Sequence, residues 1–348
     1  MNEIRATMGE GGTPLIPSVC LGPDAGYPRL FFKLENCNPS GSYKDRFIAA
    51  EVTRILRTGR RVCVGTSSGN TGSALAAYAA RYGIRCVIFV NERTPAGKLT
   101  QMRSYGARIV RVRGFGEDPA ITAAICADLE RLSQERSVPL VISAFRYCPD
   151  GMLGVSAISQ ELLEQQPKPA IDHVFVPVGG GGLFSAVAEG FLALRARPPA
   201  IHAVQPEGCS TVAASFLAGR DTIEPVASST RVSGLSVPFD IDGSLALQYL
   251  KRCGGTGLTV SDDEVFTAQS HLLQREGIYC EPAGAAALAG FRKAAASGII
   301  GRDQVSVCLV TGHGSKDPDA MERVASLNRE RLIDARDLAG EFRHLAVS

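Results

Sequence analysis

One lysine of this chain stands where it could act as a nucleophile toward a carbonyl group. Lys44 follows the turn-forming run Asn-Pro-Ser-Gly at 38–41 and opens a segment whose apolar residues recur at helical spacing. An amine attacks a carbonyl only when it is neutral, and a helix N-terminus and partial desolvation both disfavour the lysine cation. Schiff-base chemistry with a carbonyl cofactor needs such a lysine. A solvated lysine paired with Asp45 is the alternative, because a short motif alone is weak evidence.

Four consecutive glycines could bind a phosphate group. Gly179, Gly180, Gly181 and Gly182 lie between the apolar run 173–178, which predicts a strand, and a segment of helical spacing. Without Cβ atoms, successive backbone N–H groups can approach an anion, and a helix N-terminus adds partial positive charge. No Gly-Lys-Ser/Thr ending follows, so a nucleotide-triphosphate loop is disfavoured. The sequence therefore predicts a phosphate-binding loop, with a plain flexible loop as the alternative.

Polar residues follow two more predicted strands. Ser67, Ser68, Asn70 and Thr71 come just before an alanine-rich helical segment, and Thr311 ends an apolar run. Open α/β sheets bind their ligands at the carboxyl ends of the strands. A cluster of helix caps and a threonine at a strand end are the structural alternatives for these two segments.

The order of these four segments resembles pyridoxal phosphate (PLP) enzymes of the tryptophan synthase β type, also called fold type II. Within that group the chain is most similar to threonine synthases, over residues 9–318. The resemblance implies that Lys44 is the catalytic residue and carries PLP through a Schiff base. It also implies that Asn70 bonds the pyridine 3′-oxygen and that Thr311 faces the pyridine nitrogen. The cofactor phosphate is then held by Gly179, Gly180, Gly181, Gly182 and Leu183.

The same resemblance implies how an amino-acid substrate is treated. The carboxylate of that substrate would be bound by Ser67, Ser68 and Thr71. A neutral hydroxyl at Thr311 permits a weaker electron sink than a carboxylate, which suits elimination and replacement rather than transamination. The leading hypothesis is therefore a threonine synthase-like lyase of amino-acid biosynthesis that converts O-phosphohomoserine and water into threonine and phosphate.

One departure from the threonine synthase pattern leaves other functions open. Those enzymes usually carry an arginine for the substrate phosphate where this chain has Gly151. Lys98 and Arg146 are the candidate substrate-binding replacements. The alternatives are a β-replacement synthase acting on O-phosphoserine or O-acetylserine, a serine/threonine dehydratase, and a non-catalytic PLP-binding protein.

The alternation of predicted strands and helices indicates an α/β fold, and 348 residues exceed the usual size of one core. The resemblance implies two lobes, each a mostly parallel sheet flanked by helices, with the PLP site in the cleft between them. We expect a small lobe at 45–145 and a discontinuous large lobe at 1–44 and 146–348. The stretch 214–257 is interpreted as irregular, and Glu281 as the start of a helix.

Composition narrows the choice of partners. With 45% hydrophobic residues, 21% charged residues and a net charge of +2, the chain offers no electrostatic case for nucleic acid or an anionic membrane. No leader peptide or membrane-spanning run is expected. The ten cysteines form no C-x-x-C pair, so we expect free thiols, no metal site and a cytoplasmic location. A homodimer is implied by the resemblance alone.

Overall fold

Two sheets organise the part of the chain that a computed structural model describes, residues 4–116, 119–166, 168–194, 197–328 and 330–345. In the larger, six-stranded sheet, one edge strand runs antiparallel to its neighbour and the other neighbouring pairs are parallel. Its strands, in spatial order, are β1 (Leu15–Pro17), β2 (Leu30–Lys33), β10 (Ser306–Leu309), β7 (His173–Pro177), β8 (Ala200–Pro206) and β9 (Gly257–Val260).

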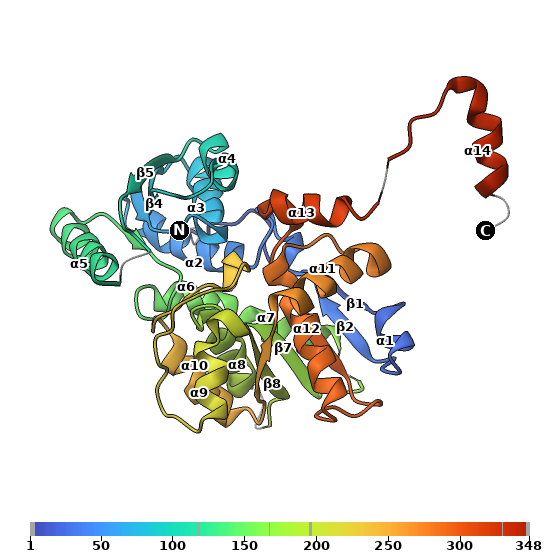
Figure 1. The fold of residues 1–348 in the computed structure, drawn as a ribbon. Coiled ribbons are helices and arrows are strands. Elements are labelled where there is room, and N and C mark those ends of the chain that lie inside the picture. Colours follow the sequence, from blue (N-terminus) through green and yellow to red (C-terminus); the bar gives the residue numbers. More distant parts are fainter. Residues whose placement is uncertain (1–3, 117–118, 167, 195–196, 329, 346–348) are drawn as a thin grey trace.

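The smaller sheet has four parallel strands and lies apart from the larger one, as Figure 1 shows. Its strands, in spatial order, are β5 (Arg108–Val112), β4 (Arg85–Asn91), β3 (Val62–Gly65) and β6 (Leu140–Val141). The helices of this half of the molecule are α2 (Lys44–Arg57), α3 (Asn70–Arg81), α4 (Ala96–Ser104) and α5 (Pro119–Arg136). The expected fold class, two lobes of mostly parallel sheet with flanking helices, is confirmed.

The remaining helices belong to the larger half of the molecule and the C-terminal segment. They are α1 (Leu21–Asp24), α6 (Pro149–Val155), α7 (Ala157–Gln165), α8 (Gly182–Leu194), α9 (Thr211–Leu217), α10 (Gly243–Arg252), α11 (Asp262–Glu276), α12 (Pro282–Ala296), α13 (Pro318–Ala325) and α14 (Leu338–Leu345). Short 3-10 helices occupy Glu35–Cys37, Glu207–Cys209, Ser233–Leu235, Gly314–Lys316 and Ala335–Asp337. In Figure 1, α14 stands away from both sheets.

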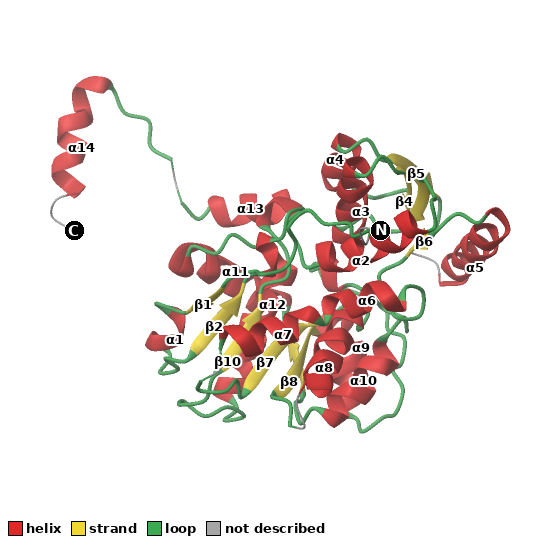
Figure 2. Cartoon of the chain, turned by 180° about the vertical axis from the view of Figure 1, so that it is seen from behind, coloured by secondary structure: helices red, strands yellow, loops and turns green. Residues whose placement is uncertain are grey.

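Helices cover both faces of the larger sheet, as Figure 2 shows from behind. Every residue of β7 is buried, which is typical of a parallel strand packed on both sides. Val174 and Val176 of this strand join the hydrophobic cluster that contains α7 and α8, whereas Phe175 joins the cluster that contains α11 and α12. The strand therefore has a fixed register, and the loop that follows it leaves from a rigid edge.

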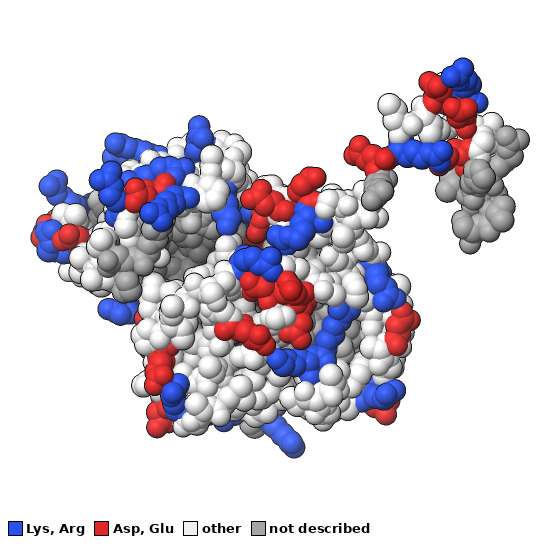
Figure 3. All heavy atoms as spheres, in the orientation of Figure 1, with Lys and Arg blue, Asp and Glu red and all other residues white. Residues whose placement is uncertain are grey.

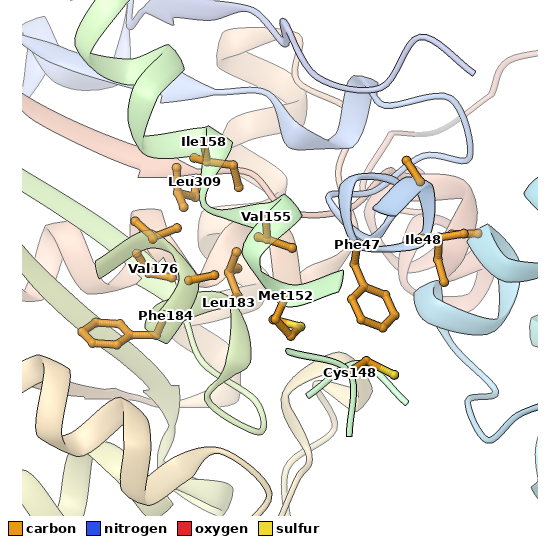
Figure 4. Close-up of a cluster of buried hydrophobic side chains, with 14 of the residues drawn as sticks. Phe47, Ile48, Cys148, Met152, Val155, Ile158, Val176, Leu183, Phe184 and Leu309 are labelled. Carbon is orange, nitrogen blue, oxygen red and sulfur yellow. The ribbon is translucent and has the colours of Figure 1, made fainter. Parts of the chain in front are cut away.

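The first of these clusters continues into the smaller half of the molecule. Phe47 of α2 and Met152 of α6 lie side by side in Figure 4, with Leu183 and Phe184 of α8 in the same cluster. Phe47, Met152 and Phe184 have no exposed surface. This packing fixes the N-terminal turns of α2 and α8 relative to each other, and these turns carry the predicted lysine and the predicted phosphate loop.

Two predictions from local pattern were incomplete. The stretch 214–257 is less irregular than expected, because it contains α10 and leads directly into β9. The continuous apolar run at 84–90 predicts a strand buried on both faces, but the residues of β4 alternate between buried and more exposed positions. The smaller sheet thus has one face that is only partly covered. The Ser-x-x-Glu spacing of Ser261 and Glu264 predicts a capping box, and the structure has this capping box at the start of α11.

The face of the molecule shown in Figure 3 carries charged side chains of both signs, which are interspersed. Among the residues described, no helix combines the length and apolar character needed to cross a bilayer.

Candidate active site

A cavity of about 790 Å³ is lined by residues of both halves of the molecule. Its size lies in the range of cofactor and substrate sites. All but one of the site residues predicted from sequence line it. These are Lys44, Ser67, Ser68, Asn70, Thr71, Lys98, Gly179, Gly180, Gly181, Gly182, Leu183 and Thr311.

Lys44 is the first residue of α2, and its side chain is half-buried at the cavity wall. Its Nζ donates a hydrogen bond to Ser143 Oγ at 2.6 Å. The segment before it is joined to the end of β10: Tyr43 N–H donates to the carbonyl of Thr311 at 3.2 Å, and Ser42 forms a bridge with Gly312. These backbone contacts place the lysine beside the strand end that carries Thr311.

A buried ion network holds the first turn of α2 from behind. Arg46 donates to both carboxylate oxygens of Glu35 at 2.7 Å and to those of Glu161 at 2.6 and 2.8 Å. Lys33 adds a bond to Glu161 at 2.6 Å. Burial alone would raise the pKa of Glu161, but the bonds from Arg46 and Lys33 lower it to about 2. The network ties α2 to β2 and α7.

The glycine loop connects β7 to α8, which begins at Gly182. Gly181 has a φ of 101°, and a Cβ built on it would lie 2.4 Å from the carbonyl oxygen of Asp242. Asp242 N–H also donates to the carbonyl of Gly180 at 2.9 Å, and its carboxylate accepts the N–H of Phe145 at 2.7 Å. Burial raises the pKa of Asp242, against the bonds that its carboxylate accepts from the backbone N–H groups of Phe145 and Arg146. Only glycine fits position 181, so the loop adopts one shape at the N-terminus of a helix.

Asn70 and Thr311 face the cavity from the two sides of the cleft. Asn70 is the first residue of α3, and its Nδ2 donates to Glu281 Oε1 at 2.7 Å. Glu281 does begin a helix as predicted, but its side chain makes no cap bond there and lines the cavity instead. Burial raises the pKa of this carboxyl, against the bond from Asn70. Thr311 is 5% exposed.

Two lysines reach the cavity from opposite halves of the molecule. Lys98 of α4 donates to Ser233 Oγ at 2.7 Å, and Lys316 donates to Gln101 Oε1 at 2.6 Å. Burial lowers the pKa of Lys316 to about 8, although the nearby Glu281 raises it. The resemblance to threonine synthases extends over residues 9–318, but Lys316 was not predicted as a site residue.

Arg146 does not line this cavity. Its side chain is exposed, lines a separate hollow of about 310 Å³ and lies over the ring of Tyr147 at 5.3 Å. Arg146 contacts the region of the glycine loop through its backbone, because its N–H donates to Asp242 Oδ1 at 3.3 Å. The structure therefore does not bring the guanidinium of Arg146 to this cavity, and its role as a substrate ligand stays a prediction.

The residues of the cavity fit PLP. The glycine loop offers backbone N–H groups at a helix N-terminus for the phosphate, with no Cβ in the way. Lys44 offers an amine, Thr311 a hydroxyl and Asn70 an amide around the same space. A lysine at a cavity between two mostly parallel sheets, together with a glycine loop at a helix N-terminus, is typical of an enzyme that binds a phosphorylated carbonyl cofactor.

Comparison with known proteins agrees with this class. The family model described as pyridoxal-phosphate dependent enzyme matches residues 6–312. The chain belongs to this family, its cofactor is PLP, and the expected class of PLP-dependent lyase is confirmed.

Relatives and solved structures extend over most of the chain. It is 34% identical to threonine synthase of Methanocaldococcus jannaschii, over 91% of this chain and 78% of that protein. It is 32% identical to threonine synthase of Halalkalibacterium halodurans, over 92% and 87%. Its fold is similar to an L-serine ammonia-lyase of Rhizomucor miehei, with a TM-score of 0.77, 24% identity and coverage of 91% and 98%. Serine racemase of Dictyostelium discoideum gives a TM-score of 0.70 at 25% identity, over 87% and 92%.

Proposed function

We propose that this enzyme is threonine synthase-like and converts O-phosphohomoserine and water into threonine and phosphate. The observation that carries the proposal is the pair of lysines, Lys98 and Lys316, in the cavity that also contains Lys44. A phosphorylated substrate needs cations near its leaving group, and two ammonium groups supply them. The threonine synthase relatives, which match about nine-tenths of the chain, support the same substrate.

The site residues predicted from sequence that line the cavity each have a role in this proposal. Lys44 holds the cofactor and then, as a free amine, moves protons at the α- and β-carbons of the substrate. PLP supplies the electron sink that makes the α-proton removable. With PLP bound, Asn70 would donate to its 3′-oxygen, and Thr311 would face its pyridine nitrogen. The substrate carboxylate is bound by Ser67, Ser68 and Thr71, and the cofactor phosphate by Gly179, Gly180, Gly181, Gly182 and Leu183.

A second candidate is β-replacement or deamination of a serine derivative. It is favoured by Gly151, where threonine synthases usually carry an arginine. Gly151 lies on α6 and is absent from the cavity lining. Solved structures of similar fold include O-ureido-L-serine synthase and threonine deaminase, at 21% identity each. Among the substrates of such reactions, O-acetylserine, serine and threonine would need fewer cations or none, whereas O-phosphoserine carries the same phosphate group as O-phosphohomoserine and would use the same two lysines.

The deciding experiment compares these substrates on the PLP-loaded enzyme, with phosphate, threonine and ammonia all measured. We expect release of phosphate and threonine in equal amounts from O-phosphohomoserine. Turnover of an activated serine, with none of O-phosphohomoserine, would replace the first proposal by the second. Loss of all turnover while PLP stays bound would favour a non-catalytic binding protein.

Variants test the role of the two lysines. Lys98→Met and Lys316→Met should each raise KM for O-phosphohomoserine by about ten- to a hundredfold, as expected for loss of a charge-assisted bond. Lys251→Met removes an exposed lysine that pairs with Asp221 and serves as the matched control. Since the pKa of Lys316 is lowered to about 8, its cation is lost as pH rises through that value. KM of the parent enzyme should therefore rise above pH 8, and KM of Lys316→Met should rise less.

Two further features are part of the proposal. We infer a homodimer and a cytoplasmic location, on the basis of the family resemblance. Light scattering on the purified holoenzyme tests the first, and a mass of 36.8 kDa would identify a monomer. The lobe boundaries at 45 and 145 stay a prediction, which limited proteolysis can examine.

A further inference from the structure

Glu281 makes a contact that its place at a helix start does not require. Glu281 is the N-cap residue of α12 and directly precedes Pro282, yet its carboxylate accepts no hydrogen bond from the backbone of that helix. Its backbone N–H instead donates to the carbonyl of Gly312 at 3.0 Å, and its Oε1 accepts Asn70 Nδ2 at 2.7 Å. The side chain is 8% exposed. A buried acid that serves no cap and reaches across the cleft to a single amide has a role at that amide.

The chain around Glu281 is shaped to admit this contact. A Cβ built on Gly312 would lie 2.0 Å from Glu281 Oε1 and 3.2 Å from Asn70 Nδ2. Any side chain at position 312 would therefore separate the acid from the amide. Gly312 directly follows Thr311, so the contact lies next to the hydroxyl proposed to face the pyridine nitrogen.

The chemistry of the amide gives this contact a consequence. An asparagine side chain has two donor hydrogens on its nitrogen and one acceptor oxygen, and a half-turn exchanges them. Glu281 Oε1 accepts one of these hydrogens and so favours the orientation in which Nδ2 lies on the acid side. The second hydrogen of the same nitrogen is then available to an acceptor in the cavity. The charges facing Glu281 are Lys316, Asp317 and Lys98, and the two lysines favour its ionised, accepting form.

We propose that Glu281 is a positioning residue that acts through Asn70, holding the amide so that an N–H is presented to the 3′-oxygen of PLP. This inference rests on the proposed role of Asn70 as a cofactor ligand. It adds a residue that the family likeness alone left as a helix start. Because the contact joins the two halves of the molecule, it also makes the binding of the cofactor depend on the position of α3.

A double-mutant cycle on PLP affinity tests the proposal without any substrate. The dissociation constant is measured by titrating the cofactor-free protein with PLP and following its visible absorbance. Glu281→Ala should weaken PLP binding by about tenfold in the parent background, as expected for one hydrogen bond, and by less than twofold in the Asn70→Ala background. The absorbance maximum of the loaded Glu281→Ala protein should move to that of Asn70→Ala.

Conservative variants separate positioning from a purely structural role. Glu281→Gln keeps an acceptor oxygen of the same reach and should restore affinity to within about threefold of the parent. Glu281→Asp shortens the side chain and should behave like Glu281→Ala. Glu276→Gln removes a different carboxylate, one that accepts the N–H of Leu21, and should leave PLP affinity unchanged.

The outcomes exclude one another. Equal weakening by Glu281→Ala with and without Asn70 would show that the acid does not act through this amide and would overturn the proposal. Unchanged affinity and unchanged absorbance in Glu281→Ala would do the same. If Glu281→Ala fails to fold, the pair Glu281→Gln and Glu281→Asp decides in its place. Because no substrate is present, failure of O-phosphohomoserine turnover leaves this test unaffected.

Discussion

Removing Arg46 should destabilise the protein more than removing any surface arginine, because its guanidinium is the centre of the buried ion network behind Lys44. The Arg46 side chain is 3% exposed, and the carboxylates that it bridges are 0% exposed at Glu35 and 17% at Glu161. Arg46→Met keeps the apolar volume of the side chain but leaves both carboxylates without this cation. Breaking a buried pair in this way typically costs about 3–5 kcal/mol. We expect a loss of that size in the free energy of unfolding at pH 7.

The pH dependence of the loss has a defined sign. The pKa of Glu161 is lowered from 4.5 to about 2, so the network stabilises the parent fully above pH 4.5, and this contribution disappears as pH falls toward 2. The difference of 2.5 between these two pKa values corresponds to about 3 kcal/mol. In Arg46→Met, Glu35 has lost this cation and Glu161 keeps only Lys33, so both carboxylates can take up protons more easily, which relieves the cost of their burial. The stability difference between parent and variant should therefore shrink as pH falls from 7 to 4.

Urea unfolding of the cofactor-free proteins, followed by circular dichroism at several pH values, measures this difference. Arg131→Met is the matched control, because Arg131 bridges Asp128 and Glu135 on the exposed surface of α5. Its unfolding midpoint should equal that of the parent. A loss below about 1 kcal/mol in Arg46→Met, constant from pH 7 to 4, would refute the idea that this network stabilises the first turn of α2.

Three further predictions concern the site and the core. Gly180→Ala should weaken PLP binding at least tenfold with little loss of stability, because its added methyl group meets no protein atom closer than 3.5 Å. Gly181→Val should instead disturb folding itself, because its side chain would clash with Asp242. Equal PLP affinity of the parent and Gly180→Ala would argue against the phosphate loop. Borohydride reduction and peptide mapping should place the pyridoxyl label on Lys44, and Lys44→Ala should bind PLP weakly and lose several orders of magnitude in turnover; a label on another lysine would exclude the proposed chemistry. Burial lowers the pKa of His202 to about 3, so the free energy of unfolding should fall by up to about 1.4 kcal/mol per pH unit as pH decreases below 6.5. In urea unfolding of His202→Gln, the free energy of unfolding should depend less steeply on pH between pH 6.5 and 5.

The parts of the site that sequence could predict are those that local pattern encodes. The glycine loop and Lys44 each lie where a predicted strand or turn meets a predicted helix, and the structure brings both to one cavity. Such junctions are recognisable because glycine runs, turn residues and helical spacing are short-range signals. Strands β1 and β2 were not predicted, since short strands of three and four residues carry too little alternation to be recognised.

The parts that sequence missed depend on contacts between distant residues. Asn70 and Glu281 are 211 positions apart, and Phe145 and Asp242 are 97 apart. The neighbouring sequence of each acid gives no sign of its contact: Glu281 precedes a proline, and Asp242 lies in the stretch interpreted as irregular. Their contacts follow from where the two sheets place them, so only the folded chain brings Glu281 to Asn70 and Asp242 to the glycine loop.

The departure at Gly151 shows why a missing motif residue needs its surroundings. A Cβ at this position would lie 2.6 Å from the ring of Phe47 and 2.7 Å from Glu51 Oε1, and the N–H of Gly151 already bonds that carboxylate at 3.1 Å. Residues of α2 therefore fill the space in which a side chain at position 151 would lie. For this reason Gly151→Arg would disrupt the core rather than restore a phosphate ligand. If the enzyme binds a phosphorylated substrate, its cations come from Lys98 and Lys316. That is why the substrate assignment depends on those two lysines.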